Sequence, residues 1–180
     1  SRLKGADPLL GVEMASTGEV ACFGDNAQQA LLQALIAVGF RMPKKNILLT
    51  IGRLEDKIDI LDAVRLLAKM KFSLYATKNT HDFLAARDVS SVLLFKVHEP
   101  RSPNIREYLE ERRVNLVINI PSQRSGPQQT DGYLIRRLAM DRGIPLITNV
   151  QLAKRFIEAI GHESPDSLPL LPWPDLLKEH

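Results

Sequence analysis

Short apolar runs alternate with helix-period stretches along most of this chain, and this alternation constrains the fold more than any other feature. Between the runs, apolar residues recur every three or four positions, as on the buried face of a helix. Each strand-plus-helix unit is about 25–30 residues long, which suits right-handed crossovers in a parallel sheet. The sequence therefore predicts an α/β domain. The runs of strand length are residues 47–51, 74–75, 92–95, 116–118 and 146–147.

Capping residues predict where the helices begin and end. Asp25 is a suitable N-cap for the first helix, with Gln28 completing a capping box, and Gly39 suits the left-handed residue that ends it. Ser102 is the expected N-cap of a later helix, with Pro103 at its first position. The helices are expected at 26–39, 56–70, 80–87, from 102 onward, at 131–142 between Thr130 and Gly143, and at 151–160 before Gly161.

Composition excludes several classes of protein. The chain has 180 residues, enough for one domain with some surplus at the ends. Its net charge of +3 is mild and its basic residues form scattered doublets, so we expect no nucleic-acid partner. The longest apolar stretch, 30–40, is too short to span a bilayer, so we expect no membrane partner. A single cysteine, Cys22, excludes an internal disulfide, and we expect a cytoplasmic protein. The chain begins without methionine, which suggests a piece of something longer.

Polar residues follow the apolar runs, at the positions where strands would end. Thr77 and Thr80 stand three apart at a strand-to-helix turn, where their hydroxyls and the first N–H groups of the helix suit a phosphate or carboxylate. The plainer interpretation is that Thr80 or Asn79 only caps the helix. In an open parallel sheet, ligands bind at the carboxyl ends of the strands where strand order reverses. We therefore expect a site for an anionic small molecule at this edge.

Three further residues are candidates for the same site. Lys57 and Lys96 are placed to supply the counter-charge, although a solvated surface lysine is the commoner case. Asn119 follows the run 115–118, and its amide suits either a ligand or the backbone of a turn before Pro121.

Motifs for chemistry are sparse. His98 beside Glu99 suggests a general base, but no nucleophile stands at a known spacing. The other histidines lack the spacing of metal ligands, so we expect no metal and no cofactor. The glycine-rich phosphate-binding motifs are missing, which weighs against dinucleotide redox chemistry and mononucleotide hydrolysis.

Several segments together resemble a known family. Residues 11–20, G-V-E-M-A-S-T-G-E-V, resemble the signature near the end of the second ATP-grasp half of carbamoyl phosphate synthetase large chains. The rest resembles the carboxyl-terminal regulatory domain of that family, which has the methylglyoxal-synthase-like fold. The matching residues are Leu49-Thr50, Asp56-Lys57, Ala76-Thr77-x-x-Thr80, Lys96-Val97-His98-Glu99, Val117-Ile118-Asn119 and Tyr133-Leu134-Ile135-Arg136-Arg137.

The resemblance implies a three-layer α/β/α fold around a five-stranded parallel sheet of order 3-2-1-4-5. It also implies an effector site, because bacterial relatives bind nucleotide monophosphates in this crevice. Pyrimidine-pathway relatives respond to uridine nucleotides and to phosphoribosyl pyrophosphate. The residues that match the family's effector contacts are Thr50, Lys57, Thr77, Thr80, Lys96 and Asn119.

Two other ligand classes fit the sequence less well. Urea-cycle relatives bind N-acetylglutamate through three asparagines, of which this chain keeps Asn119 but has Ser122 and Gly132 at the other positions. Methylglyoxal synthases use aspartates in G-G-D and W-D-P contexts, where this chain has Val97-His98-Glu99 and Asn119-Ile120-Pro121-Ser122. The catalytic carboxylates of such a lyase are therefore missing.

We expect three segments. Residues 1–40 are the end of an ATP-grasp domain with a connecting helix, residues 41–161 are the effector-binding domain, and residues 162–180 are a proline-rich tail. The expected function is allosteric control of carbamoyl phosphate synthesis by an anionic effector, either UMP or UTP or phosphoribosyl pyrophosphate. The expected protein partners are the synthetase domains of the same polypeptide, and we expect no chemistry in this segment itself. An N-acetylglutamate-binding domain, a phosphate-eliminating lyase and a docking module without a small molecule remain the alternatives.

Overall fold

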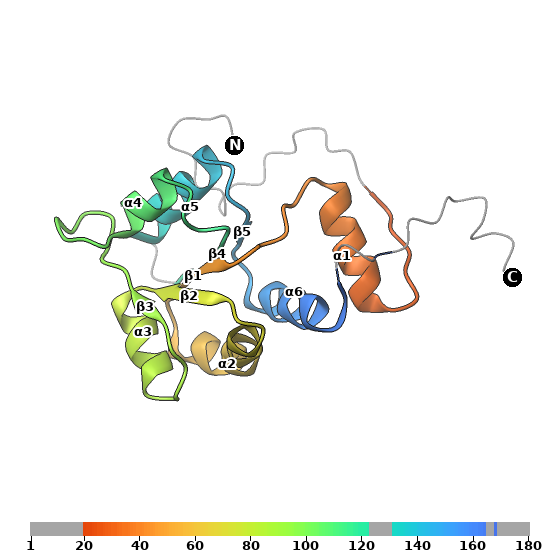
Figure 1. The fold of residues 1–180 in the computed structure, drawn as a ribbon, viewed down its shortest axis with the longest axis horizontal. Helices are drawn as coiled ribbons and strands as arrows, with labels where there is room; N and C mark the ends of the chain where they lie inside the picture. Colours follow the sequence, from red (N-terminus) through yellow and green to blue (C-terminus); the bar gives the residue numbers. More distant parts are fainter. Residues whose placement is uncertain (1–19, 123–130, 165–167, 169–180) are drawn as a thin grey trace, which may run out of the picture.

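Parallel strands form one central sheet with helices on both faces (Figure 1). The computed structural model describes residues 20–122, 131–164 and 168. The sheet has the order β3-β2-β1-β4-β5, which confirms the predicted topology. The strands are β1 (Asn46–Ile51), β2 (Ser73–Ala76), β3 (Val92–Leu93), β4 (Leu116–Ile120) and β5 (Leu146–Ile147).

The helices divide between the two faces of the sheet. In Figure 1, α2 and α6 lie on one side of the strands and α4 and α5 on the other, and α1 lies beyond α6. This is the predicted α/β/α arrangement. The helices are α1 (Ala27–Ala37), α2 (Leu54–Lys69), α3 (Lys78–Ala85), α4 (Ile105–Glu110), α5 (Asp131–Asp141) and α6 (Val150–His162).

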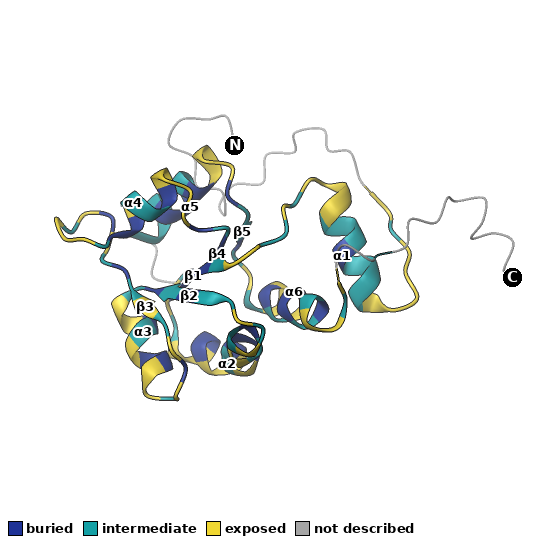
Figure 2. Cartoon of the chain, in the orientation of Figure 1, coloured by how far each residue is buried: buried dark blue, intermediate teal, exposed yellow. Residues whose placement is uncertain are grey.

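Alternation along the central strands produces two hydrophobic cores. Ile47 and Leu49 of β1 face the core formed with α2, α3 and α6, whereas Leu48 faces the core formed with α4 and α5. Successive side chains of a strand point to opposite faces, so β1 is buried on both. Figure 2 shows the same pattern, with the strands and inner helix faces buried and the outer faces exposed. These two cores hold the carboxyl ends of β1 and β4 in fixed register.

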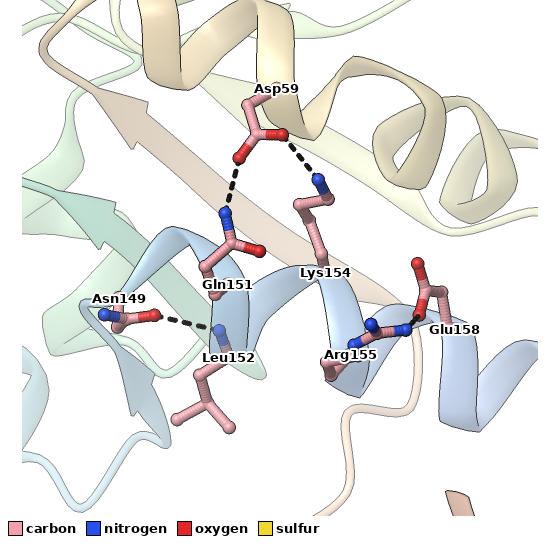
Figure 3. A network of polar contacts seen from close by, with 7 residues as sticks. All are labelled: Asp59, Asn149, Gln151, Leu152, Lys154, Arg155 and Glu158. Atoms are coloured by element: carbon pink, nitrogen blue, oxygen red, sulfur yellow. Dashed lines mark hydrogen bonds and ion pairs between the residues drawn. The ribbon is translucent and has the colours of Figure 1, made fainter.

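Helix α1 is attached to the domain through α6. Leu32 of α1 is fully buried in the core of the α2 face, and the Phe40 ring contacts the Phe156 ring edge-on at a centroid distance of 5.4 Å. Helix α6 is in turn linked to α2, because Asp59 accepts hydrogen bonds from Gln151 and Lys154 (Figure 3). The expected domain boundary between residues 40 and 41 stays a prediction. Helix α1, which precedes this boundary, packs into the same hydrophobic core as α2 and α6.

The first helix begins one residue later than predicted. Asn26 is the N-cap, and its side-chain oxygen accepts from the backbone N–H of Gln29 at 2.9 Å. The Gln29 side chain, not that of Gln28, accepts from the backbone N–H of Asp25. The N-cap bond is thus present one position later than predicted, whereas the Gln29 side chain bonds to Asp25, the residue before the N-cap. The predicted left-handed residue after α1 is confirmed at Gly39 (φ +81°), and Gly143, which was predicted to end α5, is also left-handed (φ +63°).

The predicted start of α4 was wrong. Asn104 is the N-cap, and with Glu107 it forms a complete capping box. Ser102 and Pro103, joined by a cis peptide bond, precede the helix. Two reciprocal hydrogen bonds satisfy more of the helix end than Pro103 at its first position does, which explains the shift.

Two other boundaries also differ from the prediction. Strand β4 continues through Asn119 to Ile120, because Asn119 pairs with Thr50 and Ile120 pairs with Ile51 in the ladder with β1. Helix α6 continues through Gly161, where a Cβ atom would lie 2.7 Å from the Leu66 side chain of α2. Close packing of the two helices thus explains this glycine better than helix termination does.

Some of the predictions concern residues that lie outside the described part of the chain. These are Thr130, the expected cap of α5, most of the ATP-grasp-like segment 11–20, and nearly all of the expected tail 162–180.

The packing of α1 predicts a measurable asymmetry between two of its residues. Leu32→Ala should lower the free energy of unfolding by about 2–5 kcal/mol, because it leaves a cavity in the core. Ile36→Ala on the same helix should change it far less, since Ile36 is 42% exposed. Chemical denaturation of both variants checks this, and equal effects would place α1 outside the cooperative core.

Candidate functional site

A polar cavity of about 510 Å³ opens at the carboxyl ends of β1 and β4. Strand order reverses at this point, because β1 has β2 on one side and β4 on the other. Thr50, Thr77, Lys96 and Asn119 line the cavity, so four of the six predicted site residues come together. Lys57 and Thr80 are outside its lining and lie close behind it.

Three buried polar side chains form a hydrogen-bonded chain at the base of the cavity. Arg136 of α5 donates from Nη1 to Oδ1 of Asn119 at 2.8 Å, and Nδ2 of Asn119 donates to Oγ1 of Thr50. A guanidinium can only donate, so it determines which end of the Asn119 amide faces Arg136. Thr50 must then accept from Asn119, and its own hydroxyl hydrogen is available to a ligand. The direction of these hydrogen bonds therefore makes the Thr50 hydroxyl, which faces the cavity, a donor.

Arg136 and Asp131 also line the cavity, although neither was predicted as a site residue. Arg136 is only 3% exposed. Its position offered a signal, because Ile135, Arg136 and Ala139 share the buried face of α5 with the usual helical spacing. An arginine on an inward face suggests a polar site rather than a solvated surface.

The start of α3 contributes donors to the same cavity. Thr77 is the N-cap but makes no side-chain capping bond, so the interpretation that Thr80 or Asn79 caps this helix was wrong. The Thr77 carbonyl accepts from the backbone N–H groups of Thr80 and His81. The two residues before them, Lys78 and Asn79, line the cavity at the end of the helix where N–H groups lack intrahelical partners. Such a helix end favours an anion.

Thr80 ties α3 to the end of β1. Its Oγ1 accepts from the backbone N–H of Ile51 at 3.1 Å and donates to the carbonyl of the same residue at 3.4 Å. Thr80 is 1% exposed, so it supports the cavity wall from behind.

Lys57 lies beneath the first turn of α3. It is 8% exposed, and its Nζ donates to the carbonyl oxygen of Asn79 at 3.1 Å, so the solvated alternative was wrong. Burial lowers the pKa of Lys57, and attraction to Asp82 opposes that shift. The Phe83 ring also lies 5.9 Å from the ammonium. Lys57 therefore places a positive charge behind Asn79 without reaching the lining.

Lys96 is half-exposed and already ion-paired. Its Nζ lies 3.0 Å from Oδ2 of Asp131, the first residue of α5, and the other carboxylate oxygen lies 2.6 Å from Nδ1 of His98. Asp131 itself lines the cavity, whereas His98 does not. The partner of His98 is thus Asp131 and not Glu99, which lines the cavity separately.

Gly52 is required by close backbone packing at the mouth of the cavity. A Cβ atom at position 52 would lie 2.6 Å from the backbone nitrogen of Ser122. Because this atom belongs to the backbone, no change of side-chain rotamer could remove the clash. The Gly52 N–H donates to the carbonyl of Ile120 at 2.9 Å. The two segments that leave β1 and β4 therefore touch directly.

A second, smaller cavity lies at the opposite edge of the sheet. It measures about 320 Å³ and none of the predicted site residues lines it. Its lining is basic, with contributions from Arg41, Lys44, Arg112 and Arg142.

The described part of the chain offers neither a metal site nor a membrane-spanning helix. No cluster of three or more histidine, cysteine, aspartate or glutamate residues there could hold a metal ion. Among the described helices, none is long and apolar enough to cross a membrane.

The fold and the cavity define a doubly wound α/β domain with a polar, donor-rich pocket at its switch point. Residues 59–148 match the family described as the MGS-like domain, and the chain belongs to this family. A solved methylglyoxal synthase from Elizabethkingia anophelis shares the fold, with a TM-score of 0.52 and 16% sequence identity over 77% of this chain and 93% of that one.

Curated relatives are much longer proteins. The multifunctional protein URA2 of Saccharomyces cerevisiae is 45% identical over 89% of this chain and 8% of its own length. The multifunctional protein CAD of Squalus acanthias is 43% identical over 89% and 8%. The human mitochondrial carbamoyl-phosphate synthase [ammonia] is 40% identical over 88% and 11%. The chain thus spans about a tenth of the length of these relatives.

The two threonines of the α3 turn should behave differently in unfolding experiments. Thr80→Val leaves the buried N–H of Ile51 without its acceptor, which costs about 1–3 kcal/mol. Thr77→Val should leave stability nearly unchanged, because the Thr77 side chain makes no capping bond. Denaturant titration of both variants checks this, and an equal loss in the two would contradict the assigned roles.

The buried charge of Lys57 should make the stability of a variant depend on pH. A lysine whose pKa is lowered by folding destabilises the native state while it is charged, and this penalty disappears as pH rises toward the ordinary lysine value of about 10.4. Lys57→Met should therefore be more stable than the parent at pH 7, with the difference shrinking toward pH 10. Lys69→Met, an exposed change on the same helix, should show no such trend. A stability difference between Lys57→Met and the parent that grew with pH would contradict the argument from burial.

Proposed function

We propose that this chain contains the effector-binding regulatory domain of a carbamoyl phosphate synthetase. The effector is a small anion that binds in the cavity at the carboxyl ends of β1 and β4. Membership of the MGS-like family and similarity to carbamoyl-phosphate synthase and to multifunctional proteins support this proposal. The synthetase domains of the same polypeptide are then the partners whose ATP-dependent reaction is controlled, and a cytoplasmic location stays a prediction.

The direction of the hydrogen-bonded chain from Arg136 through Asn119 to Thr50 is the observation that carries the proposal. It presents a hydroxyl donor to the cavity and uses the acceptor atoms internally. Thr77 and the first N–H groups of α3 add donors from the neighbouring wall. A site built mainly from donors suits phosphate or carboxylate oxygens.

The charges around the cavity also favour an anion. Lys78, Lys96 and Arg136 line it, and the carboxylates of Glu99 and Asp131 offset part of their charge. Lys57 adds a further cation behind the first turn of α3. We assign Lys57 and Thr80 to positioning that turn, and direct contact with the effector to Thr50, Thr77, Lys96, Asn119 and Arg136.

The lining favours a phosphorylated effector over N-acetylglutamate. Ser122 and Gly132 both line the cavity at the positions where the urea-cycle type has amide side chains. The polar groups of N-acetylglutamate would lack those partners, and each unpaired buried group costs about 1–3 kcal/mol. A uridine nucleotide or phosphoribosyl pyrophosphate has phosphate oxygens that match the remaining donors.

A lyase is the alternative function, because the solved structure with the same fold is a methylglyoxal synthase. That similarity concerns the fold alone. Of the two carboxylates that line the cavity, Asp131 is held by both Lys96 and His98, which disfavours its use as a free base. Turnover of dihydroxyacetone phosphate by the purified chain would establish the lyase and contradict the regulatory proposal.

Calorimetry with UMP, UTP, phosphoribosyl pyrophosphate and N-acetylglutamate tests the proposed function. We expect one of the phosphorylated ligands to bind at least about tenfold more tightly than N-acetylglutamate, a difference of about 1.4 kcal/mol. Thr77→Val should weaken that binding roughly tenfold or more, because a hydrogen bond to a charged group contributes about 1.5–3 kcal/mol. Thr148→Val, the same change at the end of β5 and outside the cavity, is the control. Preferred binding of N-acetylglutamate, or equal effects of the two variants, would contradict the proposal.

A further inference from the structure

Asp131 places a carboxylate inside the cavity that we assign to an anion. It begins α5, its side chain is 24% exposed, and it lines the cavity together with Lys96. Its two oxygens are both engaged, one by Nζ of Lys96 at 3.0 Å and the other by Nδ1 of His98 at 2.6 Å. The carboxylate therefore makes the contacts with Lys96 that an effector oxygen would make.

Lys78, another cation of the lining, is held differently. It pairs with Asp82, which does not line the cavity. Lys96 and Asp131 form an ion pair that has both of its members in the cavity lining. An effector that uses Lys96 must therefore share the ammonium with Asp131 or displace it.

We propose that Asp131 is an internal competitor of the effector, and that it limits affinity by occupying Lys96. This inference rests on the proposed function of the cavity. Sharing one ammonium would bring two anions close together in a half-buried site, where their repulsion is screened less than in bulk water. If the effector instead displaces Asp131 from Lys96, the Asp131 carboxylate loses its contact with the ammonium and keeps the one with His98. Either way, binding is weaker than the donors of the cavity alone would permit.

The competition has a consequence for specificity. A ligand gains from Lys96 only if its own interaction with the ammonium exceeds that of the resident carboxylate. A phosphate group, with up to two negative charges and three terminal oxygens, meets this condition better than a monocarboxylate. Asp131 thus selects against weakly charged metabolites, so it is a specificity-determining residue of this site.

Asp131→Asn tests the competition, because asparagine keeps the size of the side chain and removes the charge. We expect UMP, measured by calorimetry, to bind about tenfold more tightly to this variant than to the parent chain. Asp141→Asn is the matched control, since it removes the same charge from the far end of α5, where Asp141 pairs with Arg137 at 3.1 Å. The control should bind within about twofold of the parent.

A second variant separates release of Lys96 from general electrostatics. In a Lys96→Met background, the additional change Asp131→Asn should give little of the tenfold gain, because no ammonium is left to release. A full gain in that background would overturn the competition for Lys96.

The possible outcomes distinguish this inference from the proposed function. If the parent binds UMP and Asp131→Asn binds it no more tightly, the competition is overturned while the site assignment stands. If neither chain binds UMP, UTP or phosphoribosyl pyrophosphate, the proposed function fails and the inference fails with it. Tighter binding to Asp131→Asn, lost with Lys96→Met and not seen with Asp141→Asn, supports the competition.

Discussion

The hydrogen bond between Asn119 and Thr50 is the interaction on which the site depends. It joins the side chains of two neighbouring parallel strands at the switch point, and Arg136 determines its direction from the covering helix. Without the arginine, either end of the amide could face Thr50, and the hydroxyl would not be a dedicated donor. The buried guanidinium of Arg136 thus decides which hydrogen-bonding groups the base of the cavity offers. The proposed preference for an anion follows from that polarity together with the start of α3.

The two cores keep this arrangement rigid. The core on the α2 and α6 side fixes the strands from one face, and the core on the α4 and α5 side fixes Arg136 over the other. Lys57 of α2 bonds to the first turn of α3, and Thr80 ties that turn to the end of β1, so the donors of both walls converge. Helix α2 therefore connects the cavity to α6 and, through α6, to α1. In a longer polypeptide this packed series of helices offers a physical route by which an occupied cavity can be sensed elsewhere, provided that the two states differ in effector affinity.

Much of this organisation was predictable from the sequence, and the exceptions have physical reasons. Strand and helix positions followed from periodicity, because burial of one face repeats along each element. Asn119 was expected after its strand, since a polar residue before a proline usually marks a turn, but ladder pairing with Thr50 keeps it inside β4. Lys57 was expected at the surface or in the crevice, because the sequence does not reveal that α3 covers it. Arg136 and Asp131 escaped notice as site residues, since their roles depend on the packing of α5 against partners 17 and 35 positions away in sequence.

Amide chemical shifts during a titration with UMP test the central claim most directly. With the backbone assigned, we expect saturable shifts to concentrate at residues that surround the larger cavity, namely Thr50, Thr77–Asn79 and Asn119. The same residues should lose their response when sodium chloride is raised, because the attraction is between charges. Shifts that centre on Asn115 and Gly143, beside the smaller basic cavity at the opposite edge of the sheet, would contradict the account.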